Sequence, residues 1–444
     1  MNKGAFKMAS YLPGIHVPHR KNTRKSPTVR IDTPKTVTIP MVMHIGKPAT
    51  PIVKVGDLVK VGTKIGEADG YISSHIYSSV SGKVVKIADY LSYDGTIINS
   101  VVIESDDAMT LDETLTPPVV NDKQQLVDAI KESGIVGLGG AGFPTYVKFD
   151  VNPEQIDYLV INGAECEPYV TSDTVTMLTR ADDMSYALKT ISRCMGIDKV
   201  IIGIENNKKS AIASMKEMAK SFTDISVKVK ELPSVYPQGG EKVLVYHTTG
   251  RKIAANQLPI NVGCVVINCS TLAAIGAYLK TGIPLVEKCV TVDGGAVKHP
   301  QNIIAPIGTS IQTLFDCCGG LVEDPAKIIY GGPMMGITVP NAEYPVLKNT
   351  NAILALTKKE AKLPKTTACI RCGACINTCP FGLAPAAIAR AYDNKDIATL
   401  NSLSVETCME CGCCSFVCPS NRPLVQKNKL AKQLLKEERK KGGK

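Results

Sequence analysis

Two runs of cysteines in this chain have the spacing that binds iron-sulfur clusters. Each run reads C-x-x-C-x-x-C-x-x-x-C and is followed by a proline, Pro380 in the first run and Pro419 in the second. Three thiolates separated by two residues wrap one face of a 4Fe-4S cube, and the fourth, on the next helix, reaches the other cube. The spacing therefore predicts two clusters that exchange their fourth ligands. One is expected on Cys369, Cys372, Cys375 and Cys418, and the other on Cys408, Cys411, Cys414 and Cys379.

A pair of structural zinc sites is the alternative, because C-x-x-C also binds zinc. A zinc site takes four ligands, usually in two separated pairs, and gains nothing from a third cysteine at the same interval or from a proline after the fourth. We therefore prefer the clusters. Cys413 could replace Cys414 only by breaking the spacing of the first run, so Cys413 is expected to be an unligated neighbour.

Length and composition allow about three domains with hydrophobic cores. The chain has 444 residues, of which 44% are hydrophobic, and a net charge of +10 to which both basic ends contribute. Such ends suit acidic proteins or anionic lipid headgroups, and a solvated tail that aids solubility is the alternative. We expect no nucleic-acid partner.

The cysteines outside the two runs indicate a reducing compartment, because scattered thiols beside iron-sulfur ligands argue against a disulfide framework. The N-terminus has no apolar core of signal-peptide length. The most apolar long run, residues 263–279, is broken by polar residues and is short for a membrane span. We therefore expect a chain that does not cross a membrane.

The first part of the chain suggests a basic arm and a small β domain. Residues 1–35 are rich in proline and basic residues and show neither helical nor strand periodicity. From residue 36 to 116, the stretches VKVGDLVKVGTKIG and SSVSGKVVKI resemble the barrel-sandwich hybrid of lipoyl and biotinyl carrier domains. Those carriers present a lysine on an exposed hairpin, whereas the matching hairpin, residues 68–82, contains no lysine. A structural or docking role is expected instead.

An α/β pattern begins at residue 119, and its loops could bind a nucleotide. Four glycines between residues 137 and 142 leave backbone N–H groups bare, so a phosphate or a flat ring can approach them. Lys148 adds a positive charge one turn later. Two further polar loops, NGAECEP at 162–168 and YPQGGEK at 236–242, follow predicted strands. Because ligands bind at the carboxyl ends of such strands, we expect the three loops to face one pocket.

These loops, with VINCSTLAAI at 266–275, are similar in order and spacing to the flavin-binding loops of the NADH-oxidising subunit of respiratory complex I, over about residues 125–340. Leu138, Ala164 and Gly240 depart from that family, which carries arginine, aspartate and glutamate there. The resemblance implies FMN at Gly137, Gly139, Gly140, Gly142, Lys148, Asn162, Glu165, Tyr236, Gly239, Asn268 and Thr271. It also implies that Phe143, Glu167 and Glu241 lie towards NADH, where the two glutamates would orient the nicotinamide.

The predicted fold class is α+β with several domains. The barrel-sandwich hybrid is followed by an FMN- and NADH-binding α/β domain (119–280), a ubiquitin-like β-grasp domain of the SLBB type (281–350), an α-helical domain with two 4Fe-4S clusters (360–425) and a basic C-terminal helix (426–444). This order resembles the RnfC family, which belongs to ion-translocating ferredoxin:NAD oxidoreductases.

The RnfC resemblance implies an NADH-linked oxidoreductase subunit that passes electrons between NAD(H), FMN and two clusters. It further implies peripheral attachment at the cytoplasmic face of the cell membrane, beside integral membrane and ferredoxin-like subunits of the same complex. Two alternatives stay open at this point. One is a soluble relative that donates electrons to an amino-acid reductase or to cobalamin, and the other is an iron-sulfur wiring protein without flavin.

Overall fold

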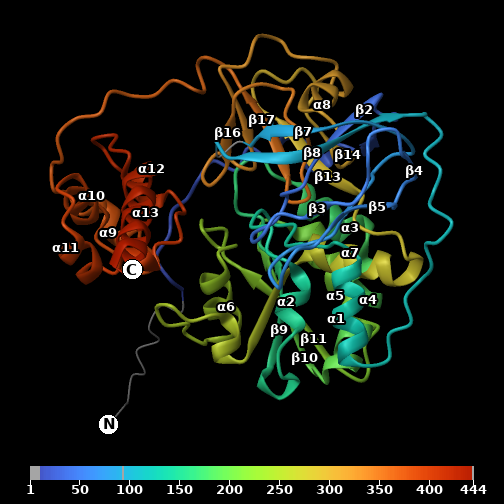
Figure 1. Cartoon of the computed structure of the whole chain (residues 1–444). Helices are drawn as coiled ribbons and strands as arrows, with labels where there is room; N and C mark the ends of the chain where they lie inside the picture. The colour runs from blue at the N-terminus through green and yellow to red at the C-terminus, as the bar shows by residue number, and fades with distance from the viewer. Residues whose placement is uncertain (1–10, 93–94, 443–444) are drawn as a thin grey trace.

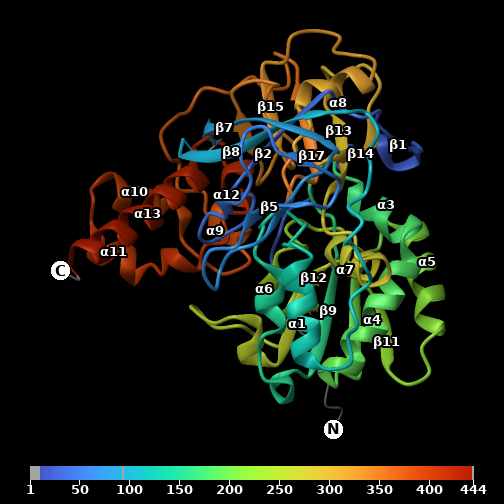
Figure 2. The same cartoon turned by 45° about the vertical axis from the view of Figure 1, so that its right-hand side comes forward.

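A computed structural model of the chain describes residues 11–92 and 95–442. The strands in these residues form four sheets, and a helical module stands to one side of them (Figure 1). After a turn of 45° the blue barrel-sandwich strands still lie between the green α/β domain and the orange sheet (Figure 2). The barrel-sandwich domain therefore contacts both the α/β domain and the third domain.

The α/β domain is built on a parallel sheet whose strands are buried apolar runs. Its strands pair in the order β11-β10-β9-β12, and all three pairings are parallel. Connecting helices lie on both faces, which is why the strands need apolar residues on both sides. The strands are β9 (Tyr158–Gly163), β10 (Lys199–Glu205), β11 (Ser226–Leu232) and β12 (Cys264–Asn268). The helices are α1 (Lys123–Glu132), α2 (Thr145–Phe149), α3 (Ser172–Thr179), α4 (Ala181–Met195), α5 (Lys209–Lys220), α6 (Glu241–Thr249) and α7 (Cys269–Thr281).

The barrel-sandwich domain has two small sheets, with strand orders β2-β8-β7-β4 and β3-β5-β6. In carrier domains the connecting hairpin is exposed, whereas in this chain residues 70–72 of the hairpin are exposed and residues 73–81 are all buried. The domain is therefore packed against the rest of the molecule through the segment that carriers use as an arm. Its strands are β2 (Thr36–Pro40), β3 (Thr50–Pro51), β4 (Leu58–Val59), β5 (Lys64–Glu67), β6 (Ile76–Tyr77), β7 (Gly82–Leu91) and β8 (Ile97–Ser105).

The third domain contributes a six-stranded mixed sheet with the order β1-β14-β13-β17-β15-β16. Strand β17 (Ala352–Leu356) pairs with both β13 and β15, so the sheet continues past residue 350, the end expected for this domain. The other elements are β13 (Glu287–Asp293), β14 (Gln301–Pro306), β15 (Lys327–Tyr330), β16 (Ile337–Val339) and α8 (Ile311–Cys317).

The N-terminal arm has more structure than its lack of periodicity indicates. Strand β1 (Thr28–Arg30) pairs in parallel with β14 and extends the third domain's sheet. Farther back, Ile15 exchanges two backbone hydrogen bonds with Tyr236, at 2.8 and 2.9 Å. The described part of the arm therefore binds along two domains. No local pattern could reveal this, because each partner lies more than 200 residues away along the chain.

The ferredoxin module consists of short helices packed on one long helix. Helix α13 (Leu424–Gly442) buries Ala431 and Leu435 against the module's own core, so the basic C-terminal helix belongs to this module. No helix in residues 11–92 or 95–442 is long and apolar enough to span a membrane. The other helices are α9 (Ala374–Asn377), α10 (Pro385–Asp393), α11 (Ile397–Ser402) and α12 (Cys413–Phe416).

Lys348, in the third domain, forms hydrogen bonds with both the barrel-sandwich domain and the α/β domain. Its ammonium donates to Ser74 Oγ at 3.1 Å, to the carbonyl of Gly134 at 2.7 Å and to the carbonyl of His75. The side chain is 1% exposed, and burial lowers the pKa of Lys348 to about 7. Because Gly134 directly precedes the glycine loop, this cation ties the barrel-sandwich hairpin to the start of that loop.

In the variant Lys348→Met, the free energy of unfolding is expected to rise less steeply between pH 7 and pH 10 than in the wild type. The unfolded chain keeps this proton up to a pKa of about 10.4, whereas the folded chain releases it near pH 7. Between these values the unfolded state binds more protons, so the free energy of unfolding rises with pH. Thermal unfolding midpoints between pH 7 and pH 10 measure this slope. The exposed control Lys362→Met should keep the wild-type slope, and an equal slope in Lys348→Met would contradict the assignment.

Candidate functional site

The glycine loop presents bare backbone donors to solvent. The Gly142 N–H donates to the Gly137 carbonyl at 3.1 Å, which closes the loop on itself. Gly140 and Gly142 have φ of +118° and +66°, a region that favours glycine. Within the described residues, the N–H groups of Gly139 and Gly140 have no acceptor in the chain, and both residues are exposed. Free, adjacent N–H groups of this kind suit a phosphate, so the loop fits the phosphate end of FMN.

Lys148 connects this loop to two other elements of the predicted pocket. Its ammonium, on α2, donates to Glu241 Oε1 at 2.9 Å and to the Val266 carbonyl at 2.8 Å. Glu241 is the first residue of α6, and Val266 lies in β12. One cation therefore brings together the helix after the glycine loop, the start of α6 and the central sheet.

The carboxyl ends of β9 and β12 carry a pair of asparagines. Asn162 and Asn268 are register partners across the two strands. Asn162 Nδ2 donates to the Gly239 carbonyl at 2.9 Å, which brings the YPQGGEK loop to the same edge of the sheet. The three predicted loops thus meet at one edge, as the sequence indicated.

Glycine at position 139 is what lets the loop lie close to β12. A methyl group on Gly139 would lie 3.1 Å from Asn268 Nδ2, so the asparagine would have to move. On the neighbouring helix, Thr271 Oγ1 accepts a hydrogen bond from the Leu138 N–H at 2.9 Å. Asn268 and Thr271 therefore hold the back of the glycine loop and leave its front open.

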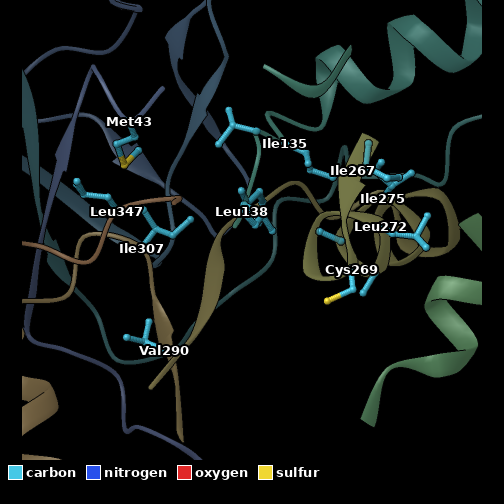
Figure 3. Packing of buried hydrophobic residues seen from close by; sticks show 14 of the residues in the cluster. Met43, Ile135, Leu138, Ile267, Cys269, Leu272, Ile275, Val290, Ile307 and Leu347 are labelled. Carbon is cyan, nitrogen blue, oxygen red and sulfur yellow. The ribbon is translucent and has the colours of Figure 1, made fainter. Parts of the chain in front are cut away.

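Leu138, where the related family carries arginine, points away from the loop opening. Its side chain is 3% exposed and packs in the main hydrophobic core. Figure 3 shows it between Ile307 and Leu347 on one side and Leu272 on the other. The apolar residue thus stabilises the junction of the domains.

Glu165 and Glu167 both use their carboxylates to hold protein loops. Glu165 Oε1 accepts from the N–H of Asp173 at 2.7 Å, at the start of α3. Glu167 accepts from the N–H groups of Met334 and Met335 at 3.0 and 2.8 Å. Burial raises the pKa of each glutamate to about 7. These contacts are structural, and together with the Thr174 hydroxyl they use both oxygens of each carboxylate.

Three buried charged residues under the site escaped the sequence analysis. Asp173 Oδ2 accepts from Asn268 Nδ2 at 2.8 Å, and the ammonium groups of Lys208 and Lys21 both donate to the Glu165 carbonyl, at 3.1 and 2.9 Å. The position of Asp173 at a helix start, directly after the NGAECEP loop, could have drawn attention to it. Nothing in the sequence links Lys21 to this loop, because it reaches the site from the N-terminal arm.

One set of four cysteines surrounds a cavity in the ferredoxin module. The cavity is lined by Cys379, Cys408, Cys411 and Cys414, the four predicted ligands, and also by Cys413. Burial, and then the three other thiols of this set, raise the pKa of Cys414 to about 12. Cys379 comes from the first run and the other three from the second, which is the exchange of ligands that the spacing predicts. We call this set the inner cluster site.

The other set combines the first run with Cys418. The pKa of Cys375 is raised first by burial, and the nearby thiols of Cys418 and Cys369 raise it further. Cys369 and Cys372 are exposed. Among the described residues no group of three His, Cys, Asp or Glu side chains is close enough to hold a single metal ion. Thiols that bind a cube stand farther apart than thiols that bind one ion, because the cube lies between them. We call this set the outer cluster site.

The inner cluster site is packed against the α/β domain. The Tyr236 hydroxyl donates to the Cys411 carbonyl at 2.7 Å. A methyl group on Gly240 would lie 2.2 Å from Met409 Cε, so glycine at this position makes room for the cysteine loop. A glutamate at this position, as in the complex I family, would require Met409 to move. Cys413, which was expected to bind no iron, lies beside the same tyrosine, with Sγ 3.9 Å from the Tyr236 carbonyl.

Two N–H groups point at a ligand sulfur of the inner cluster site. The side-chain amide of Asn428 donates to Cys408 Sγ at 3.5 Å, and the Glu410 N–H donates to the same sulfur at 3.4 Å. Asn428 is 1% exposed and lines the cavity between the four cysteines. Hydrogen bonds to ligand sulfurs raise the reduction potential of a cluster, because they stabilise the added negative charge.

The substitution Asn428→Leu is therefore expected to lower the reduction potential of the inner cluster and to leave the outer one unchanged. A redox titration followed by electron paramagnetic resonance measures both potentials in the reconstituted chain. Gln433→Leu, on the exposed face of the same helix, serves as the control and should change neither. Equal potentials in Asn428→Leu and wild type, at equal cluster content, would refute the role of this amide.

Comparison with protein families identifies four domains in the predicted order. The RnfC barrel sandwich hybrid domain matches residues 9–108, the Nuo51 FMN-binding domain residues 130–277, the SLBB domain residues 289–338 and the 4Fe-4S dicluster domain residues 368–422. These matches confirm the predicted fold class, with its flavin and iron-sulfur domains.

Individual relatives are similar over most of their length, and all three described here are RnfC proteins. The chain is 41% identical over 397 residues to the one from the Na(+)-translocating ferredoxin:NAD(+) oxidoreductase complex of Acetobacterium woodii, covering 88% of this chain and 89% of the relative. It is 40% identical over 388 residues to the one from the proton-translocating complex of Clostridium ljungdahlii, covering 86% and 84%. The third, from the ion-translocating oxidoreductase complex of Rhodobacter capsulatus, is 35% identical over 430 residues, covering 96% and 83%.

Proposed function

Because the chain belongs to the RnfC family of ion-translocating ferredoxin:NAD(+) oxidoreductase complexes, we propose that it is the subunit at which such a complex exchanges electrons with NAD(H). It is an oxidoreductase subunit with an FMN-binding domain and a domain for two 4Fe-4S clusters. One observation carries the proposal. The loop that bears Cys411 is hydrogen-bonded to Tyr236 of the predicted flavin site, so the inner cluster site adjoins that site.

Different residues of the α/β domain would bind FMN and NADH. The bare N–H groups of Gly139 and Gly140 would hold the FMN phosphate. Phe143 and Glu241 would meet NADH at the mouth of the pocket, where positioning of the nicotinamide is the main requirement. FMN, when bound, supplies the conversion between a two-electron hydride exchange and single electrons.

Lys148 holds the elements of this site in fixed positions relative to one another. Its contacts to Glu241 and Val266 fix α2, the start of α6 and β12 to one another, so the groups that face NADH and those that face FMN move as one unit. Asn162 adds a fourth element through the Gly239 carbonyl. The site is therefore built on the rigid edge of a parallel sheet, which favours the fixed spacing that hydride transfer needs.

For the location of the chain we propose peripheral attachment at the cytoplasmic face of the membrane, next to integral membrane and ferredoxin-like subunits. The curated relatives are named as parts of ion-translocating complexes, and ion translocation requires other subunits that span the membrane. NADH is a cytoplasmic substrate. The exposed thiols of Cys369 and Cys372 support an electron exit on the surface of this chain.

Anaerobic titration with NADH tests the proposed function. The chain is reconstituted with iron, sulfide and FMN, desalted, and followed by visible absorbance. We expect NADH to bleach the flavin band and the cluster bands together. The variant Gly139→Ala should lose FMN on desalting, because its methyl group meets Asn268 behind the loop and displaces the bare N–H groups from their positions. Its clusters should then respond to dithionite and no longer to NADH.

The dithionite response serves as the control for an intact ferredoxin module in both proteins. Wild-type chain that retains no FMN, and whose clusters are bleached by dithionite but not by NADH, would contradict the proposal and leave an iron-sulfur wiring protein. If Gly139→Ala retained FMN at wild-type affinity, the FMN phosphate would have to bind somewhere other than at this loop.

A further inference from the structure

The ferredoxin module repeats the shape of its cysteine loops as well as their sequence. Arg371 and Glu410 occupy the same step of the repeat, and their φ angles are +57° and +61°. Two residues later Gly373 and Gly412 have φ of +76° and +83°. Helices α9 and α12 begin immediately after these glycines. Each loop therefore presents corresponding residues in the same backbone conformation.

In the second loop this surface is covered by the rest of the chain. Met409 fills the space left by Gly240, and the Cys411 carbonyl accepts the hydroxyl of Tyr236. A methyl group on Gly412 would lie 3.1 Å from the Met334 carbonyl, so the loop also touches the third domain. In the second loop, the surface around Cys411 is therefore the surface that contacts the α/β domain and the third domain.

The equivalent surface of the first loop is exposed. Ile370 stands at the step that Met409 occupies in the second loop, and its side chain is 66% exposed. Cys372 stands at the step of Cys411 and is also exposed. Ile376 on α9 and Leu363 in the preceding segment are 45% and 77% exposed. Large exposed apolar side chains gathered beside a redox centre are characteristic of a protein interface.

The charges around this loop are all of one sign. Between Glu360 and Asp393 the sequence contains no Asp or Glu, while Lys362, Lys365 and Arg371 are exposed. In the part of the chain that the structure describes, none of these three cations makes an ion pair. They are therefore available to an acidic partner.

Several other cations of the module are paired. Lys427 pairs with Asp393, Lys432 pairs with Glu410 at 2.5 Å, and Arg439 pairs with Glu406 at 2.6 Å. Among the described residues Arg390, Lys395, Lys436 and Lys440 are also exposed without an ion pair, and what distinguishes the outer cluster site is that its unpaired cations come with the exposed apolar residues Leu363, Ile370 and Ile376. In Figure 1 the orange segment that leads into the first loop runs along the outer side of the red module.

We propose that the loop 369–373, with Lys362 and Lys365, is the docking face for an acidic surface of another subunit that carries a one-electron redox centre. The proposal rests on the proposed function and specifies its partner. One electron leaves the outer cluster and enters the iron-sulfur or flavin group of the partner, and no bond or proton moves. Acidic residues of the partner pair with the three cations and steer it, and Ile370 forms the apolar contact, as Met409 does in the second loop.

The test measures binding of the reconstituted full chain to washed membranes from cells in which the gene for this chain is deleted. The double variant Lys362→Glu/Lys365→Glu leaves the cysteine loop itself unchanged, and Arg371→Glu probes the loop directly. The matched control is Lys83→Glu/Lys86→Glu, which reverses two exposed lysines on β7. We expect binding of the double variant and of Arg371→Glu to fall at least about tenfold, with a weaker dependence on salt, since exposed charges are screened by salt.

NADH titration of the same proteins separates this proposal from the proposed function. If NADH fails to bleach the clusters of the wild-type chain, the proposed function is wrong. If NADH bleaches them in every variant and the double variant still binds membranes like the control, the docking face is wrong. Binding of the wild-type chain to vesicles of phosphatidylglycerol and phosphatidylcholine, with the same loss in the variants, would show that the cations meet lipid instead of a protein and would equally overturn the proposal.

Discussion

The contact between Tyr236 and the Cys411 loop is the constraint on which the rest of the molecule depends. Electron exchange between two bound groups weakens steeply with distance, so a flavin site and a cluster site on separate domains must be held together. The hydroxyl of Tyr236 binds the Cys411 carbonyl, and Gly240 gives space to Met409. The N-terminal arm braces the same tyrosine through Ile15. The third domain braces the neighbouring loop, because its backbone binds the carboxylate of Glu167.

Contacts of this kind explain why a chain with two redox domains also contains two domains without redox chemistry. Residues 73–81 of the barrel-sandwich hairpin are buried, and Lys348 ties them to the start of the glycine loop. The arm delivers the buried ammonium of Lys21 to the backbone carbonyls of Glu165 and Glu167, at 2.9 and 2.8 Å. Each of these cations connects its own segment to a loop far away in the sequence, so they hold the flavin loops in place without taking part in the chemistry.

Residues whose spacing is set by a cofactor could be predicted from the sequence, and residues that join domains could not. The cysteine runs and the glycine loop obey local rules, so candidate ligands could be predicted from spacing, and the family resemblance of these motifs predicted the fold class that the domain matches confirm. The roles of Leu138 and Gly240 needed the structure, because one packs in the core between domains and the other against Met409. The arm's strand and Lys21 have no local signature. Nothing in the structure explains why Ala164 replaces an aspartate.

The central claim is that electrons from NADH reach the outer cluster through the inner cluster. Removal of each cluster in turn tests this claim most directly. In Cys369→Ser/Cys372→Ser, which lacks the outer cluster, electron paramagnetic resonance after rapid mixing with NADH should show the inner cluster reduced as fast as in the wild type. In Cys408→Ser/Cys411→Ser, which lacks the inner cluster, the outer cluster should be reduced by dithionite and hardly at all by NADH. Reduction of the outer cluster by NADH at the wild-type rate in the second variant would contradict the account.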